Sequence, residues 1–241
     1  MASSSACPTV PARPFNVCGS LDCVTRSKLF EFGAQRRWAR DQMLFTAGKP
    51  ITTLHRVVSG VLARSIALSN GRRQIVDFLF PGDICGLVQS NGSHLFDCEA
   101  ITDATTRAIA ADCLRKSVGS PGIGKVIDDE VMRAVKRTAE HLVTIAKFGT
   151  GERLWHFLLW LEKTYAERGL PTHPLALPMS RSDIGDYLGM ESESVSRAFA
   201  VLKKRDLISL ISAEQVVLRG QRWGEQKEEL EAALRNAHAD E

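Results

Sequence analysis

The sequence lacks the features of an exported or membrane-bound protein. Its N-terminus, MASSSACPTVPARPF, contains no apolar run, so we expect neither a signal peptide nor an anchor. No stretch approaches the roughly 18 consecutive apolar residues that a membrane span needs. None of the six cysteines forms a CxxC pair. Without an export signal, we expect a cytoplasmic protein with reduced thiols and no membrane partner.

Strong net charge and catalytic motifs are also missing. The 31 Lys and Arg residues nearly balance the 28 Asp and Glu residues, which leaves a net charge of +3 and only a weak preference for polyanions. No GxSxG or HExxH motif occurs. The stretch GSPGIGKV, residues 119–126, matches part of a P-loop, but Val126 stands where a Mg²⁺-binding Ser or Thr is needed. A nucleotide hydrolase is therefore a remote alternative to a simple Gly/Pro connection, and we predict no enzyme and no metal.

The first half of the chain reads as short strands separated by turns. With 44% hydrophobic residues among 241, the chain is long and apolar enough to bury a sizeable core. Asn70-Gly71 lies between two β-branched runs, LHRVVSGVLARSIAL and RRQIVDFLF, a pattern that predicts a hairpin. Several such strands over residues 30–115 predict a small sandwich or barrel.

A long helix is predicted over residues 125–148. Apolar or small residues recur there at steps of three and four, namely at Ile127, Val131, Ala134, Thr138, Leu142 and Ile145. A helix of this length needs a partner for its apolar face. The pattern alone does not decide between a second copy of the chain and the neighbouring barrel. A second helix, over 151–169, is ended by Gly169 and Pro171.

Two short helices are predicted within SRSDIGDYLGMESESVSRAFAVLKK, residues 180–204. Ser180 and Asp183 form a capping-box pattern at the start of the first helix, and Gly189 can end it in a left-handed conformation. In the second helix, from about Ser192 to Lys203, one face is apolar. The opposite face carries three polar residues at i, i+3 and i+4, namely Glu193, Ser196 and Arg197.

These three residue types suit the reading of base pairs. Arg can donate two hydrogen bonds to guanine, Glu can accept one from cytosine, and Ser can serve either a base or a phosphate. A helix-turn-helix protein presents such residues at the start of its second helix. The alternative is an exposed polar face with an ordinary Glu–Arg pair. An alternating stretch at 206–220 favours base reading, because winged domains place a hairpin after the reading helix.

At this point residues 20–222 resemble the CRP/FNR superfamily of bacterial transcription regulators, in its FNR/FixK branch. The stretch LPMSRSDIGDYLGMESESVSRAF is close to the helix-turn-helix signature of that family. The resemblance implies an α+β fold with an N-terminal β-roll of the jelly-roll, cyclic-nucleotide-binding type. The implied division is a mobile tail (1–24), the β-roll (25–120), a dimerisation helix (121–149), a winged helix-turn-helix domain (150–225) and a C-terminal tail (226–241).

The resemblance also implies function. It implies a homodimer that binds double-stranded DNA at a TTGAT-N4-ATCAA-like palindrome, contacts RNA polymerase as an activator, and responds to low oxygen or nitrogen-oxide metabolism. Carried over by position, Glu193, Ser196 and Arg197 read bases, whereas Ser180, Arg181 and Ser194 contact phosphates. The long helix, with the six residues named above, forms the dimer. One departure is Glu191, where the family often has Thr as a helix cap; Ser192 is the alternative cap.

The chain has few of the residues with which members of this family bind their effectors. Members that bind cyclic AMP use a Glu where Leu87 stands, and no Arg occurs between Gly82 and Glu99. Cluster-binding members use four cysteines, but Cys7, Cys18 and Cys23 have a different spacing. We therefore predict a FixK-like regulator without a cofactor. The alternative is an FNR-type redox or iron–sulfur sensor, with Cys18 and Cys23 as candidate redox thiols.

Overall fold

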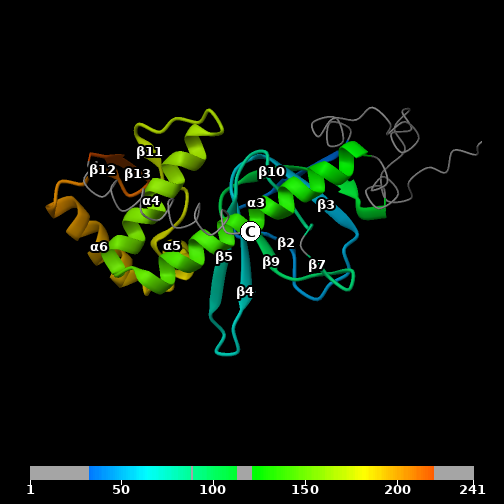
Figure 1. Ribbon diagram of the computed structural model, residues 1–241, viewed down its shortest axis with the longest axis horizontal. Coiled ribbons are helices and arrows are strands. Elements are labelled where there is room, and N and C mark those ends of the chain that lie inside the picture. Colours follow the sequence, from blue (N-terminus) through cyan, green and yellow to red (C-terminus); the bar gives the residue numbers. More distant parts are fainter. Residues whose placement is uncertain (1–32, 88, 113–120, 220–241) are drawn as a thin grey trace, which may run out of the picture. The chain divides into compact units, whose positions relative to one another are not determined.

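The computed structural model describes the chain except residues 1–32, 88, 113–120 and 220–241 (Figure 1). Both predicted tails, and with them Cys7, Cys18 and Cys23, lie outside the described residues. The chain divides into two compact units. The first contains the residues up to Phe148 together with Pro178–Glu191, and the second contains Gly149–Leu177 and the residues from Ser192 onward.

Two four-stranded antiparallel sheets form most of the first unit (Figure 1). We call them together the roll. One sheet has the order β1-β10-β3-β6 and the other has the order β2-β9-β4-β5. Their strands are β1 (Ala34–Trp38), β2 (Met43–Phe45), β3 (Thr53–Ser59), β4 (Leu62–Ala67), β5 (Arg73–Leu79), β6 (Ile84–Cys85), β9 (Asp97–Ala100) and β10 (Ala104–Ala110). A small two-stranded ribbon adds β7 (Gln89–Ser90) and β8 (Ser93–His94). The predicted β-roll is confirmed.

Alternating side chains of both sheets point inward and form a core. One cluster of this core contains Val57, Leu62, Leu79, Cys85, Cys98, Ala100 and Ala104. Both cysteines are free thiols with no exposed surface, so they pack as small hydrophobic residues. Burial, together with a hydrogen bond to Cys85, raises the pKa of the Cys98 thiol well above its ordinary value. A thiol held protonated in this way is a poor metal ligand and a poor nucleophile.

Asn70-Gly71 turns the chain between β4 and β5, as predicted. Gly71 has a φ of +80°, and the Leu68 amide donates to the Arg72 carbonyl at 2.7 Å. The two strands pair antiparallel from Leu62 opposite Leu79 to Ala67 opposite Arg73. Strand β5 of this hairpin also contacts the helix formed within residues 178–191 of the same unit.

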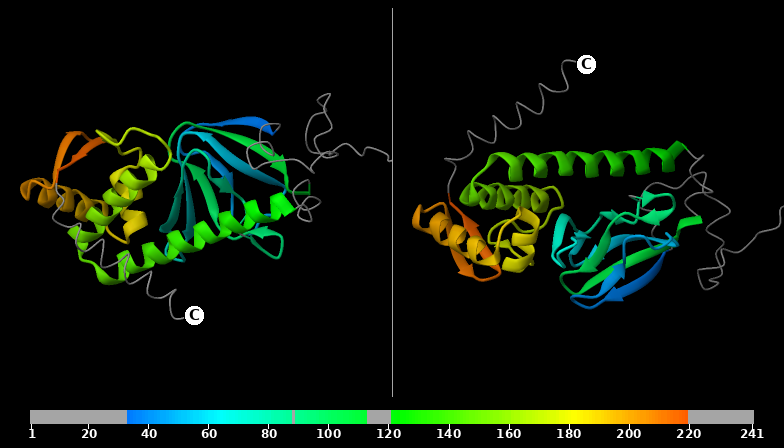
Figure 2. Two further views of the ribbon diagram at one scale, coloured as in Figure 1. Left: turned by 45° about the horizontal axis from the view of Figure 1, so that its top comes forward. Right: turned by 90° about the horizontal axis from the view of Figure 1, so that it is seen from below.

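Helix α3 (Pro121–Lys147) runs alongside the roll (Figure 2). It begins earlier than the predicted residue 125, because Pro121 is well suited to the first turn of a helix. Gly122 and Gly124 therefore lie in helical backbone, not in a phosphate-binding loop. The prediction of a Gly/Pro connection is wrong for residues 121–124, and the partial P-loop match loses its structural basis.

The side of α3 that faces the roll is polar. Glu130 and His141 are buried, and Arg137 donates to Asp77 of β5 at 3.0 Å. Asp77 also accepts from the buried Arg64 of β4. Burying charges is costly unless they are paired, so this network fixes α3 on the roll through matched ions. The apolar face of α3 is not the one used for this contact.

The second unit contains α4 (Thr150–Ala166), α6 (Ser192–Lys204) and a three-stranded sheet of order β11-β13-β12. The strands are β11 (Leu175–Ala176), β12 (Ile208–Ser212) and β13 (Gln215–Leu218). Helix α4 buries Trp155 and Leu158 completely and packs on α6. The β12–β13 hairpin follows α6 directly, as the predicted wing. Helix α5 (Arg181–Leu188) belongs to the first unit.

Candidate DNA-binding site

Helix α6 has one buried face and one exposed polar face. Val195, Phe199 and Leu202 are buried, with at most 2% of their surface exposed. These residues recur at steps of four and three, so they form one stripe. Ala198 belongs to the same buried face, whereas Ser196, Arg197, Ala200 and Val201 are exposed. The helix thus presents polar side chains on a rigid support, as a reading helix needs.

Glu193, Ser196 and Arg197 all lie on the exposed face of α6. Arg197 donates from Nη1 to Oε1 of Glu193 at 2.8 Å and from Nη2 to the Ser194 hydroxyl at 3.1 Å. Ser196 donates its hydroxyl to the Ser192 carbonyl at 3.0 Å. The structure therefore brings three of the predicted DNA contacts, Glu193, Ser194 and Arg197, into one hydrogen-bonded group. The ordinary ion pair that the sequence left as an alternative is also present, and it is compatible with base reading.

The start of α6 lies at Ser192. Ser192 is therefore its first residue and not its cap, and Glu191 occupies the position before the helix. The Glu191 side chain instead pairs with Arg72 of the β4–β5 hairpin at 2.5 Å. A carboxylate near a helix N-terminus is still favourable, because it interacts with the helix dipole.

The first turn of α5 carries the predicted phosphate contacts Ser180 and Arg181. The Ser180 hydroxyl accepts from the Asp183 amide at 3.1 Å, and the Asp183 carboxylate accepts from the Ser180 amide at 2.8 Å. This reciprocal pair is the predicted capping box. Gly189 ends the helix with a φ of 65°, also as predicted. The Arg181 side chain is half-buried, and burial lowers the pKa of its guanidinium.

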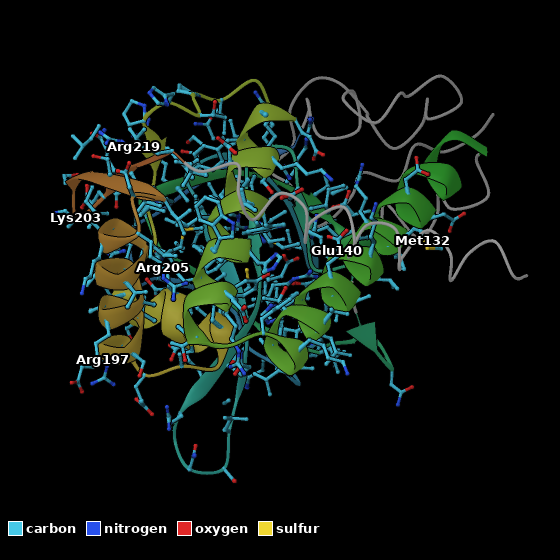
Figure 3. All side chains as sticks on the ribbon, turned by 60° about the vertical axis from the view of Figure 1, so that its left-hand side comes forward. Met132, Glu140, Arg197, Lys203, Arg205 and Arg219 are labelled. Carbon is cyan, nitrogen blue, oxygen red and sulfur yellow. The ribbon has the colours of Figure 1, made fainter. Side chains whose placement is uncertain are left out.

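Basic residues follow the exposed face of α6 toward its end. Lys203 and Arg205 are exposed, and Figure 3 shows Arg197 and Lys203 toward opposite ends of the helix. On the strand side of the second unit, Arg219 pairs with Asp206 at 3.3 Å. No DNA contact was predicted for these residues. Their signal, a Lys-Lys-Arg run at the end of the helix, was present in the sequence.

An exposed apolar stripe runs along α3. The exposed fractions are 40% for Val131, 67% for Met132, 58% for Val135 and 60% for Leu142. Of the predicted dimer residues, Val131, Thr138 and Leu142 are exposed, whereas Ala134 and Ile145 are half-buried. The side chain of Ile127 lies outside the described residues. Met132 was not predicted, although its spacing of three and ten residues to Val135 and Leu142 would have revealed it.

Two negative findings concern only the described residues. In the part of the chain that the structure describes, no helix combines the length and apolar character needed to cross a membrane. Within the same ranges, no group of three or more His, Cys, Asp or Glu side chains could hold a metal ion.

Comparisons with known proteins match both halves of the chain. Residues 152–220 match the family model of the Crp-like helix-turn-helix domain, and residues 35–118 match that of the cyclic nucleotide-binding domain. The chain is 31% identical to the nitrogen fixation regulation protein FixK of Bradyrhizobium diazoefficiens over 85% of this chain and 86% of that protein. It is 25% identical to the transcriptional activatory protein AadR of Rhodopseudomonas palustris, over 83% of each chain.

A solved structure agrees with these relatives. FixK2 from Bradyrhizobium japonicum superposes with a TM-score of 0.73 at 31% identity, covering 79% of this chain and 94% of that chain. The agreement extends over both the roll and the helix-turn-helix region, so the order of parts is the same as in that protein.

Proposed function

Because the chain belongs to the CRP/FNR family of DNA-binding transcription regulators and is FixK-like, we propose that it binds a TTGAT-N4-ATCAA-like palindrome as a homodimer and activates transcription there. Its homologues are regulators and not enzymes. The observation that carries the proposal is the exposed polar face of α6, where Glu193 and Arg197 stand at the start of a helix whose other face is buried.

The proposed roles follow from the chemistry of each side chain. Arg197 donates to a guanine, Glu193 accepts from a cytosine, and Ser196 contacts a base or phosphate. Ser180, Arg181 and Ser194 contact phosphates, which position the protein on the duplex without reading sequence. To donate to a phosphate, the Ser180 hydroxyl would have to give up its hydrogen bond to the Asp183 carboxylate. These contacts require DNA, so we place the protein in the cytoplasm with the chromosome.

The exposed stripe of α3 supports the homodimer. An apolar surface with Met132, Val135 and Leu142 each more than half exposed is unfavourable in water. A second copy of the same helix would cover it, since these residues follow the spacing of a coiled-coil seam. The polar face of α3 already contacts the roll, which leaves the apolar stripe free for the partner subunit. A two-fold axis would then present two reading helices to two half-sites.

A cyclic AMP ligand is not part of the proposal. The buried cations on the inner side of α3 and the roll, Arg64 and Arg137, both pair with Asp77, and Arg137 also lies 3.8 Å from Asp83. Leu87 offers no group to the ribose or phosphate of a nucleotide. We therefore propose that the dimer binds DNA without a small ligand. Activation is supported by the similarity to AadR, a transcriptional activatory protein, and contacts with RNA polymerase are supported by the family resemblance alone. The signal, low oxygen or nitrogen-oxide metabolism, is supported by the resemblance alone.

Fluorescence anisotropy with a labelled TTGAT-N4-ATCAA duplex tests the proposal. The protein is purified in air with no added ligand or metal, and a random duplex of equal length is the control. Tight binding to the palindrome alone supports the proposal. Equal binding to both duplexes contradicts it. Binding that appears only after anaerobic reconstitution with iron and sulfide supports the alternative of a cluster sensor that uses the N-terminal cysteines.

A further inference from the structure

Helix α5 is held by strand β5 of the roll through one arginine. Arg73 lies at the start of β5, and its guanidinium contacts three carboxylates. Nη2 lies 2.5 Å from Oδ1 of Asp183, and Nε lies 2.8 Å from Oδ2 of Asp186. The third partner is Glu99 of the neighbouring strand β9. About a third of the Arg73 side chain is exposed, so these charge-assisted bonds are partly shielded from water.

The next residue of β5 holds the other end of α5. Gln74 donates from Nε2 to the carbonyls of Asp186 and Tyr187, the latter at 3.1 Å. The last four carbonyls of a helix have no partner within the helix, so Gln74 supplies bonds that α5 cannot make itself. The strand thus binds the first turn of α5 through Arg73 and its last turn through Gln74.

The side chain of Tyr187, in the last turn of α5, adds an aromatic contact. It stacks on His141 of α3 with ring centroids 3.9 Å apart, and it meets Phe78 of β5 at 5.0 Å. Burial raises the pKa of the Tyr187 hydroxyl. Helix α5 is therefore fixed by polar contacts at both ends and by an aromatic contact from its last turn. All these residues belong to the first unit.

We infer that Arg73 is a positioning residue for DNA binding: it fixes the orientation of α5, the first helix of the helix-turn-helix, although it makes no contact with DNA itself. The inference rests on the proposed function. Asp183 joins the two roles, because one carboxylate oxygen binds Arg73 while the other caps Ser180. Arg73 thereby fixes the turn that carries Ser180 and Arg181, the proposed phosphate contacts. A residue of the β-roll would thus set the orientation of α5, the helix whose first turn carries two of the proposed phosphate contacts.

A neighbouring ion pair supplies the matched control. Arg72 precedes Arg73 in the chain and pairs with Glu191 at 2.5 Å, but both side chains are more than half exposed. Exposed pairs of this kind contribute little. Arg72→Ala therefore removes the same charge from the residue just before β5 without releasing α5.

Asp186→Asn separates positioning from simple electrostatics. This change removes a negative charge from α5, which by charge alone would strengthen binding to a polyanion. If Arg73 positions α5 through Asp186, the change instead weakens binding. It also leaves Arg73 with Asp183 and Glu99 as partners, so this variant is milder than Arg73→Ala and decides the question if Arg73→Ala fails to fold.

The experiment measures full-length wild type, Arg73→Ala, Arg72→Ala and Asp186→Asn in two ways. Anisotropy with the palindromic duplex at several salt concentrations gives affinity and its salt dependence. Hydrogen exchange of peptides covering 181–188, without DNA, reports the docking of α5. We expect affinity to fall about tenfold for Arg73→Ala, with a salt slope reduced by no more than about 1, because Arg181 is the charged one of the two proposed phosphate contacts that Arg73 positions. We expect a smaller loss for Asp186→Asn, faster exchange in α5 for both, and little change for Arg72→Ala.

Three results would overturn the inference. Unchanged exchange of α5 in Arg73→Ala would show that Arg73 does not hold the helix. Faster exchange with unchanged affinity would show that docking is irrelevant to DNA. Tighter binding by either Asp186→Asn or Arg73→Ala would contradict positioning by Arg73: in the first variant the lost negative charge alone would explain the result, and in the second the docked helix would oppose DNA binding. Failure of the wild type to prefer the palindrome is distinguishable from all three results, because it overturns the proposed function. Hydrogen exchange, which is measured without DNA, would still show whether Arg73 holds α5 on the roll.

Discussion

The guanidinium of Arg197 donates a hydrogen bond of 2.8 Å to the carboxylate of Glu193, one turn earlier on α6. Both side chains are more than half exposed, so the pair adds little to stability. The pair instead orients both side chains, because it reduces the number of conformations that these two long side chains can adopt. On DNA, each side chain would replace part of its bonding to the other with a hydrogen bond to the edge of a base. The pair therefore orders both side chains before they bind.

Removing either partner should relax specificity at one base pair of each half-site. We expect Arg197→Ala or Glu193→Ala to weaken binding to the palindrome by about 1–3 kcal/mol and to leave binding to random DNA nearly unchanged. Anisotropy with single-base variants of the duplex would locate the affected position. Lys203→Ala, at the other end of α6, is the control and should not change the preferred sequence. Equal losses on specific and random DNA would contradict the base-reading assignment.

Arg181 should behave differently, because a phosphate contact carries no sequence information. We expect Arg181→Ala to weaken specific and random binding alike, and to reduce the slope of log K against log salt by about 1. A titration at several salt concentrations measures both quantities. If the variant lost affinity for the palindrome only, Arg181 would belong with the base-reading residues.

The sequence predicted those parts of the fold that depend on neighbouring residues. The hairpin at Asn70-Gly71, the capping box of Ser180 and Asp183, and the left-handed end at Gly189 each follow from a few adjacent residues, and the structure confirms all of them. The exposed polar face of α6 was predicted for the same reason, since helical spacing alone determines it.

Contacts between distant segments were not predictable in this way. Arg73 and Asp183 are 110 residues apart in the chain, and their pairing depends on where α5 docks. The contact between the polar face of α3 and the roll was also not predicted. Charged residues such as Arg137 and Glu130 are typical of a solvated helix face, and only the fold brings Asp77 and the roll against them. The apolar periodicity alone gives residue 125 as the start of α3, because Pro121, Gly122 and Gly124 are typical of a Gly/Pro connection, whereas the division implied by the family resemblance starts this helix at residue 121.

Two buried histidines should make stability depend on pH. Burial lowers the pKa of His55 to about 4, with a further contribution from the nearby charges of Arg36 and His94. Burial likewise lowers the pKa of His141 to about 4, although the charge of Asp77 opposes the shift. In the unfolded chain both titrate near 6.5. As the pH falls from 6.5 toward 4, the unfolded state binds protons that the folded state does not, so stability is lost across this window.

At pH 5 the loss should be about 2 kcal/mol for each of these histidines relative to pH 7. Chemical denaturation at the two pH values measures it. We expect His55→Gln, which cannot titrate, to be less stable than the wild type at pH 7 but to lose about 2 kcal/mol less between pH 7 and pH 5. The same pH dependence in both proteins would show that His55 is not held neutral by the fold.

A charge within the exposed stripe of α3 should prevent assembly. We expect Leu142→Glu to be a monomer in sedimentation velocity, because two carboxylates would face one another in a desolvated helix pair. Its affinity for the palindrome should fall steeply, since a monomer binds only one half-site. Lys136→Glu, at an exposed and already charged position of the same helix, is the control and should remain a dimer. A dimeric Leu142→Glu protein would mean that the subunits meet elsewhere.

The tight turn between β3 and β4 should tolerate no side chain at Gly60. This residue has a φ of +79°, and a Cβ there would lie 2.3 Å from the Asp103 carbonyl oxygen and 2.7 Å from the Ala104 Cα. Both neighbours are backbone atoms that cannot move without disturbing β10. We expect Gly60→Ala to destabilise the protein by about 3 kcal/mol or more, from backbone strain and steric overlap together.

Gly71 provides the matched comparison, because its φ is +80° but no atom lies within 4 Å of the added Cβ. Gly71→Ala should therefore cost only the backbone strain of about 1–2 kcal/mol. Thermal unfolding of the two variants separates strain from overlap. Equal losses of stability in the two variants would contradict this prediction, because they would show that Asp103 and Ala104 do not block a side chain at Gly60.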